Sequence, residues 1–368
     1  MSLTREAVLE ALRPIQDPDL HKDIVTLGFV KPEYVAIDDG VVSVRVVLTT
    51  PACPVKAQME QDVRTRIAAL PGVREVKVTM DAVTASGRGP EGGRLPQVKN
   101  ILAVGSGKGG VGKSTVAVNL ALALSQTGAR VGLLDADIYG PSIPIMLGLK
   151  NRSPTMTADQ KIEPIEAYGL KAISMGMLLK ENDAVVWRGP MLGKALQQFI
   201  EDVAWGELDY LVMDLPPGTG DVQLSLSQLV PVDGAIVVTT PQDVAFADVR
   251  RAIRMFEMTK VPLLGLIENM SYFLCPDNGK TYHIFGESRT ERHATEAGVP
   301  FLGRLPLDLA VGPAADRGEP IAVAQPDGEQ ARLYHDMAGK IAAMLSTRHL
   351  EKEKKASFGS FFKMKGGE

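Results

Sequence analysis

A glycine-rich loop between a predicted strand and a predicted helix constrains this chain of 368 residues more than any other feature. The loop follows the apolar run 101–104 and precedes the stretch 116–124, where apolar residues recur at helical spacing. Its residues are Gly107, Lys108, Gly109, Gly110, Val111, Gly112, Lys113, Ser114 and Thr115. Such glycines let successive backbone N–H groups point into one anion-sized nest, and the helix N-terminus adds partial positive charge. The loop therefore predicts a nucleotide site in which Lys113 reaches the β- and γ-phosphates and Ser114 binds Mg²⁺.

Carboxylates end two other predicted strands. Asp214 follows the apolar run 210–213, and Asp135 and Asp137 follow the run 131–134. Because the carboxyl ends of parallel strands meet at the ligand crevice of an open sheet, these acids should lie near the phosphates. Asp214 has the form of a Walker B carboxylate, which holds Mg²⁺ through water. We expect Asp137 to orient the attacking water, with Asp135 as its support or as an outer ligand of the metal.

Apolar runs alternate with helical patterns from residue 98 to about 346, which is typical of an α/β domain with a parallel sheet. The runs predicted as strands are 101–104, 131–134, 170–174, 210–213, 235–238, 263–267 and 301–305. The predicted helices are 113–126, 191–203, 222–229, 245–258 and 288–297, with a last one near 328–345. Several of the strands are apolar throughout, as expected where helices cover both faces of a sheet.

A small α+β domain is predicted to precede this P-loop domain, over residues 1–85. Its strands 34–37 and 41–48 are joined by Asp39-Gly40, a favoured hairpin pair. Residues 86–97 are rich in Gly and Pro and predict a flexible linker to the P-loop domain at 98–346. The lysine-rich tail 347–368 predicts a disordered terminus; a weak basic and aromatic contact with a membrane or partner is the alternative.

Net charge, the lengths of the apolar runs and the number of cysteines exclude several classes of protein. The formal charge of −4 argues against a general nucleic-acid binder. No apolar run approaches the ~20 residues that span a bilayer, and the N-terminus lacks the pattern of a signal peptide. Only two cysteines, Cys53 and Cys275, are present, so a disulfide framework is excluded and a cytoplasmic location is expected. These thiols, where they matter, act as reactive groups or metal ligands.

Cys53 stands just before a predicted helix, with Pro54 expected at the first helical position. A helix N-terminus lowers the pKa of a nearby thiol, which favours a reactive group. A small, buried and inert cysteine is the alternative, and the local sequence does not decide between them.

The loop resembles the deviant Walker A motif of the dimeric ATPases of the MinD, ParA and ArsA type. Its early lysine, Lys108, matches the residue that reaches the partner's nucleotide in that class. The resemblance implies a homodimer that sandwiches two ATP molecules, with Lys108 and Lys113 both serving hydrolysis. A cation at the Lys108 position offsets charge on the transferred phosphoryl group.

More narrowly, residues 98–346 resemble the Mrp/ApbC branch, which are ATP-binding iron–sulfur cluster carriers. The matching stretches are 135–142, 187–191, 214–221 and 268–271. Within the last of these, Asn269 matches the residue that recognises adenine. Residues 1–85 resemble the small domain of SufT-like iron–sulfur assembly factors, including 17–19 and 49–54. The resemblance implies ATP, Mg²⁺ and an iron–sulfur cluster as ligands, and cluster scaffold proteins and apo-proteins as partners.

The segment around Cys275 departs from the carrier pattern. The family has a Cys-x-x-Cys pair here, so two protomers supply four thiolates to a bridging cluster. In this chain the second position is Asn278, a poor iron ligand; Asp277 and His283 are nearby candidates. Three alternatives follow: a weakly held cluster completed by solvent or a small thiol, thiolates supplied by Cys53, or loss of cluster binding.

Two functions therefore remain open. The first is an ATP-hydrolysing carrier that transfers iron–sulfur clusters, with Cys275 and Cys53 as cluster ligands. The second is a positioning or partition ATPase of the MinD/ParA kind, which uses the same engine without a cluster.

Overall fold

The computed structural model describes residues 3–18, 20–84, 86, 95–138, 140–177, 189–218 and 230–365, with backbone only for 189–194, 244 and 353–365. The chain divides into two compact units: Met1–Gly87 together with Gly339–Glu368, and Arg88–Ala338. Most of the predicted linker, the predicted helix 222–229 and the matching residues 19, 139, 187, 188 and 219–221 lie outside the described residues. The domain limits given above remain predictions.

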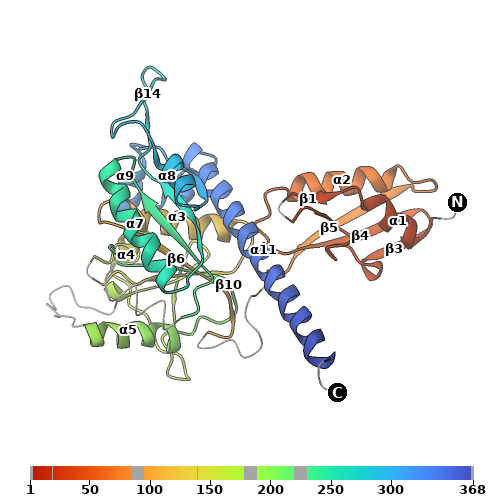
Figure 1. The fold of residues 1–368 in the computed structure, drawn as a ribbon, viewed down its shortest axis with the longest axis horizontal. Coiled ribbons are helices and arrows are strands. Elements are labelled where there is room, and N and C mark those ends of the chain that lie inside the picture. Colours follow the sequence, from red (N-terminus) through yellow and green to blue (C-terminus); the bar gives the residue numbers. More distant parts are fainter. Residues whose placement is uncertain are drawn as a thin grey trace. The chain divides into compact units, whose positions relative to one another are not determined.

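The second unit is built on one large, mainly parallel sheet (Figure 1). Within the described residues it has eight strands, in the order β15-β12-β11-β6-β10-β7-β9-β8. The strands are β6 (Val98–Ser106), β7 (Val131–Asp135), β8 (Ile165–Ala167), β9 (Leu170–Ser174), β10 (Leu208–Asp214), β11 (Gly234–Thr239), β12 (Leu263–Glu268) and β15 (Phe301–Arg304). All pairs are parallel except β8 with β9. The predicted α/β fold is confirmed.

The topology places a ligand crevice at the carboxyl end of β6. Helix α3 (Lys113–Gln126) leads from β6 toward β7 on one side, and α7 (Asp243–Met258) leads from β11 to β12 on the other. Right-handed crossovers that run in opposite directions put these two helices on opposite faces of the sheet. The strand order therefore reverses at β6, and such a switch point is where open α/β sheets bind ligands.

Burial follows from this covering on both faces. Every residue of β7, β10 and β11 is buried, which explains the apolar runs 131–134, 210–213 and 235–238 within these strands. The remaining helices of the unit are α4 (Ile143–Met146), α5 (Gly189–Glu201), α8 (Thr290–Glu296), α9 (Val311–Asp316) and α10 (Ile321–Ala324), with a 3₁₀ turn at Met175–Met177.

A buried carboxylate joins three strands at the opposite end of the sheet. Asp209 of β10 accepts hydrogen bonds from Lys99 Nζ at 2.8 Å and from the backbone N–H of Arg130 at 2.9 Å. The Arg130 guanidinium adds a contact at 3.4 Å. Burial raises the pKa of Asp209, but these donors outweigh it and hold the pKa below its ordinary value.

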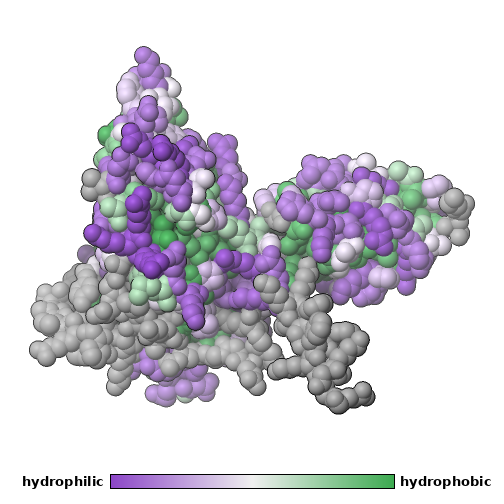
Figure 2. Space-filling model, viewed as in Figure 1, coloured by the Kyte–Doolittle hydropathy of each residue, from purple (hydrophilic) through white to green (hydrophobic). Residues whose placement is uncertain are grey.

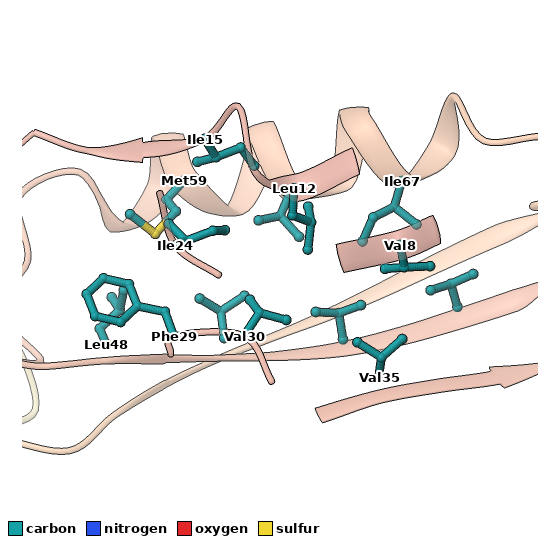
Figure 3. Packing of buried hydrophobic residues seen from close by; sticks show 14 residues of the cluster. Val8, Leu12, Ile15, Ile24, Phe29, Val30, Val35, Leu48, Met59 and Ile67 are labelled. Atoms are coloured by element: carbon teal, nitrogen blue, oxygen red, sulfur yellow. The ribbon is translucent and has the colours of Figure 1, made fainter. Parts of the chain in front are cut away.

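The first unit is a three-stranded sheet with two helices over one face. Strand β4 (Val41–Leu48) pairs antiparallel with β3 (Val35–Asp38) and parallel with β5 (Glu75–Ala82). Helices α1 (Arg5–Leu12) and α2 (Lys56–Ala68) pack over it, and Figure 3 shows apolar side chains such as Val8, Leu12 and Ile67 filling the space between. Short strands β1 (Gln16–Asp17) and β2 (Lys22–Asp23) and a 3₁₀ turn (Pro32–Tyr34) complete it.

The predicted Asp39-Gly40 hairpin is present. Both residues have positive φ, 42° and 80°, as a type I′ turn in a two-residue hairpin loop requires. The structure starts α2 at Lys56, so Pro54 lies before the helix rather than at its first position.

The last helix, α11 (Glu329–Lys365), continues far beyond the end predicted near residue 345. Its later part belongs to the first unit, where Ser346 Oγ donates to the Thr49 carbonyl at 3.4 Å and Ala343 is buried. Lys, Glu and Ala dominate 351–356 and are strong helix formers, which explains the extension. The phenylalanine side chains of the tail lie outside the described residues. Among the helices described, none combines the length and apolar character needed to cross a membrane.

Candidate nucleotide site

The glycine loop connects β6 to the first residue of α3. Gly110 and Gly112 have φ of 78° and 79°, which glycine adopts far more readily than other residues. A Cβ atom on Gly112 would lie 2.2 Å from Asn269 Nδ2, and one on Gly107 would lie 2.4 Å from the carbonyl carbon of Asp248. A Cβ atom on Gly109 or Gly110 would meet no atom within 4 Å. The loop is thus tightly packed at its ends and open in its middle, as a phosphate cradle needs to be.

Lys113 is the centre of charge in the site. Its Nζ donates to Asp214 Oδ1 at 2.5 Å and to Ser114 Oγ at 3.2 Å, and lies 3.6 Å from Asp137 Oδ2. The side chain is only 6% exposed, so these two carboxylates hold a buried ammonium. The structure brings the P-loop lysine, the P-loop serine and two of the three predicted strand-end acids, Asp214 and Asp137, into one cluster.

Asp214 has an unused oxygen that points to a further ligand. Its side chain is fully buried, and its Oδ2 atom has no hydrogen-bond partner among the described residues. Burial raises the pKa of Asp214, against the lowering effect of the Lys113 charge. A hydrated Mg²⁺ would satisfy this oxygen, so the donor set of Asp214 and Ser114 fits the predicted metal.

Asp135 supports the loop that carries Asp137. Its carboxylate accepts from the Asp137 N–H at 3.1 Å, from the Ile143 N–H at 3.3 Å and from Ser174 Oγ at 2.9 Å. Burial, reinforced by the neighbouring Asp214, raises the pKa of Asp135 to about 7. Its bonds hold the backbone N–H groups of Asp137 and Ile143, and its supporting role remains a prediction.

Asn269 lies between the glycine loop and a cavity of about 360 Å³. Its Nδ2 donates to the Val111 carbonyl at 2.9 Å. A volume of ~300–1,000 Å³ is typical of pockets for small organic ligands. The lining combines the loop, residues after β15 and the start of α11: Gly112, Thr115, Asn269, Met270, Pro306, Leu307, Asp308, Leu309, Val311, Gly312, Pro313, Gln330 and Tyr334.

Most of these lining residues were missed from the sequence. Residues 306–313 carry no recognisable motif, and they are mostly small or apolar. One signal was available, because they follow the carboxyl end of a predicted parallel strand, which is the edge where ligands bind.

Lys108 is half-buried at the start of the loop. Its carbonyl accepts a hydrogen bond from Ser106 Oγ at 2.9 Å.

Cys275 stands in a hairpin that projects from the second unit (Figure 1). Strands β13 (Phe273–Leu274) and β14 (Thr281–Tyr282) form it, and the Cys275 N–H donates to the Lys280 carbonyl at 3.0 Å. Asn278 serves the turn: its Oδ1 accepts from the Lys280 N–H at 2.9 Å and its Nδ2 donates to the Tyr282 hydroxyl. The hairpin tip is mostly hydrophilic on the face drawn in Figure 2.

Asp277 and His283, the nearby candidate ligands, are both exposed. Within the described part of the chain, no three His, Cys, Asp or Glu side chains are grouped to hold a metal ion.

Cys53 lies in the first unit and lines a small cavity there with Asp17, Thr50 and Ser346. It is partly buried and packs against the apolar core of the unit. The two cysteines thus belong to different units.

Comparison with known families agrees with this geometry. Residues 97–342 match the family described as NUBPL iron-transfer P-loop NTPase, of the ParA type. Residues 5–79 match the family described as iron–sulfur cluster assembly protein.

Close relatives span nearly the whole chain. An iron–sulfur cluster carrier protein of Deinococcus radiodurans is 51% identical over 345 residues, covering 94% of this chain and 97% of that protein. One of Synechocystis is 48% identical over 349 residues, covering 94% and 98%. A nucleotide-binding protein from Archaeoglobus fulgidus in complex with ADP has a TM-score of 0.57 and 38% identity, covering 64% of this chain and 92% of that chain.

The cell division ATPase MinD of Pyrococcus furiosus, at 21% identity and a TM-score of 0.51, shares the fold; it covers 67% of this chain and 99% of that chain. The P-loop cluster and these matches lead to one conclusion: the chain belongs to the ParA-type family of NUBPL iron-transfer P-loop NTPases, with an iron–sulfur cluster assembly domain at its N-terminus.

Proposed function

We propose that the chain is a homodimeric carrier that binds and hydrolyses ATP and transfers iron–sulfur clusters to apo-proteins. The observation that carries the proposal is the buried cluster of Lys113, Asp214 and Asp137 beneath an open glycine cradle. The identity of the transferred group is supported by two family matches that both concern iron–sulfur proteins and by relatives named as cluster carriers.

Each residue of the nucleotide site has a role in this proposal. The phosphates of ATP compete with Asp214 and Asp137 for the Lys113 ammonium and accept hydrogen bonds from the backbone of 107–115. Ser114 directly, and Asp214 through water, hold Mg²⁺, which offsets charge on the phosphates. Asp137 orients the attacking water, and Asp135 holds Asp137 in place. Asn269 recognises the adenine in the adjoining cavity.

Lys108, the other lysine of the glycine loop, is the reason for proposing a homodimer. Lys108 starts the cradle, and in a face-to-face dimer it would reach the nucleotide of the partner subunit. A cation there stabilises the charge that develops during phosphoryl transfer. ATP would thus close the dimer, and hydrolysis would loosen it.

Cys275 is the proposed ligand of the cluster. Thiolates are the usual ligands of iron–sulfur clusters, and two protomers supply two Cys275 thiolates. Asn278 is engaged in the turn, so the remaining ligands come from Cys53 or from a small thiol or solvent. Scaffold proteins that load the cluster and apo-proteins that receive it are the proposed partners, in the cytoplasm.

Cluster transfer tests the proposal. Protein loaded with cluster under anaerobic conditions is mixed with an apo-enzyme whose activity requires a cluster, with and without Mg·ATP. We expect activity to appear, at a rate that ATP changes in the wild type but not in Lys113→Ala. Absence of transfer would contradict the proposal. ATP-dependent co-sedimentation with liposomes or DNA, without transfer, would favour a MinD/ParA-like positioning ATPase instead.

A further inference from the structure

Glu268, the last residue of β12, is a buried carboxylate to which the proposed function gives no role. It is fully buried, and its two oxygens accept hydrogen bonds from three hydroxyl groups. Ser271 Oγ donates at 2.5 Å, Ser288 Oγ donates at 2.7 Å, and Thr290 Oγ1 donates as well. Burying a charged carboxylate costs free energy unless hydrogen-bond donors surround it. The three hydroxyl donors offset that cost for Glu268.

The three hydroxyls stand at the two ends of the segment that carries Cys275. Ser271 precedes the first strand of the hairpin. Ser288 and Thr290 follow its second strand, and Thr290 is the first residue of α8. Arg304, at the end of β15, approaches the same carboxylate at 3.9 Å. One side chain therefore gathers both ends of the Cys275 segment and holds them to the sheet.

The same segment is hydrogen-bonded to the wall of the cavity that Asn269 lines. The Ser271 N–H donates to the Leu305 carbonyl at 2.9 Å, and the Leu307 N–H donates to the Tyr272 carbonyl at 2.7 Å. Leu307 lines the cavity and pairs with Phe273 of the hairpin. Asn269, next to Glu268 in the chain, contacts the glycine loop through Val111.

We propose that Glu268 is a positioning residue that couples nucleotide binding to the position of the Cys275 hairpin. A nucleotide that hydrogen-bonds to the Asn269 amide or contacts Leu307 shifts the backbone at these residues. The hairpin moves with it, because its backbone is bonded to Leu307. The carboxylate transmits that displacement, because it fixes both ends of the hairpin to the residue beside Asn269. The inference rests on the nucleotide-binding half of the proposed function and needs no cluster.

The rate at which N-ethylmaleimide alkylates Cys275 reports the coupling. The full chain is treated with and without Mg·ADP, and peptide mass spectrometry measures the rate at each cysteine separately. ADP should change the Cys275 rate by about fivefold or more in the wild type. Cys53, in the other unit, serves as the comparison within the same molecule.

Thr290 offers a matched pair of variants. Thr290→Val removes the hydroxyl donor at nearly constant volume, whereas Thr290→Ser keeps the donor. We expect Thr290→Val to bind ADP like the wild type by calorimetry and to lose most of the ADP-dependent change at Cys275. Thr290→Ser should retain that change. Loss of the ADP effect in Thr290→Val at unchanged ADP affinity is the result that a merely structural role for the hydroxyl would not predict. Where Thr290→Val fails to fold, the half-buried Ser288 provides the same comparison as Ser288→Ala and Ser288→Thr.

Two results would overturn the coupling while leaving ATP binding intact. One is a wild type that binds ADP but alkylates Cys275 at the same rate with and without it. The other is full retention of the ADP effect in the variants without the hydroxyl. A wild type that does not bind ADP at all would instead contradict the proposed function, and this inference with it.

Discussion

At the scale of single residues, the two lysines of the glycine loop stand in different environments. Lys113 is buried between Asp214 and Asp137, whereas Lys108 is half-buried at the start of the loop. An ammonium so enclosed by carboxylates is held in position before any phosphate arrives. The difference in environment leads us to expect different effects of substitution.

Lys113→Ala should abolish detectable nucleotide binding or lower the hydrolysis rate by about 10²-fold or more, because the phosphates lose their buried cation. Lys108→Ala should bind ATP like the wild type and lower turnover by a comparable factor, since its proposed partner is the other subunit's nucleotide. Calorimetry with ADP and a phosphate-release assay measure the two effects. An unchanged hydrolysis rate in Lys108→Ala would show that Lys108 does not act across the dimer.

Gly112→Ala should lower the free energy of unfolding by about 1–3 kcal/mol. The substitution forces a side chain into a left-handed conformation and into the Asn269 amide. Gly109→Ala is the matched control, because a Cβ there meets open space, and its stability should stay close to that of the wild type. Urea denaturation compares the two variants; equal stability would show that Asn269 does not press on the loop.

At the scale of the elements, the parallel strands of the sheet were predictable, whereas its antiparallel edge strand β8 was not. The buried strands β10 and β11 contain the apolar runs 210–213 and 235–238, so their composition alone marks them. Strand β8 has only three residues, one of them the exposed Glu166, and pairs antiparallel at the edge, so no apolar run announces it. The length of α11 was missed because its later part has no clear apolar periodicity, although its residues favour a helix.

Asp209 gives a prediction about how the strands are joined. Asp209→Asn should lower the free energy of unfolding by about 1–3 kcal/mol at pH 7, because the carboxylate receives charged donors in a buried position. The pKa of Asp209 lies below its ordinary value in the folded protein. The ionised carboxylate therefore contributes its full stabilisation at pH values above the ordinary pKa of an aspartate, and this contribution is lost as the pH falls. The cost of the variant should therefore be constant near neutral pH and shrink below about pH 4.

Urea denaturation at several pH values measures this cost. Glu207→Gln is the control, because the ion pair of Glu207 with Arg130 is exposed and should contribute less than about 1 kcal/mol. A cost for Asp209→Asn that does not fall in acid would mean that shape, and not charge, joins the strands.

At the scale of the whole molecule, the sequence predicted the residues of the nucleotide site better than the ligands of the iron–sulfur cluster. Lys113, Ser114, Asp214 and Asn269 occupy sites dictated by local motifs and by strand ends, so their convergence follows from the topology. Glu268 and the cavity wall beyond β15 have no motif, because their role depends on contacts between distant segments. The proposed sharing of a cluster by thiolates of two protomers depends on how two copies of the chain meet, which no local pattern encodes.

The central claim, that the chain carries an iron–sulfur cluster on Cys275, is tested most directly by anaerobic reconstitution with iron and sulfide. Visible absorbance of the purified protein then reports bound cluster. We predict cluster absorbance in the wild type and its loss in Cys275→Ala; a loss in Cys53→Ala as well would identify the second ligand. No cluster absorbance in the wild type, or unchanged absorbance in both variants, would contradict the account.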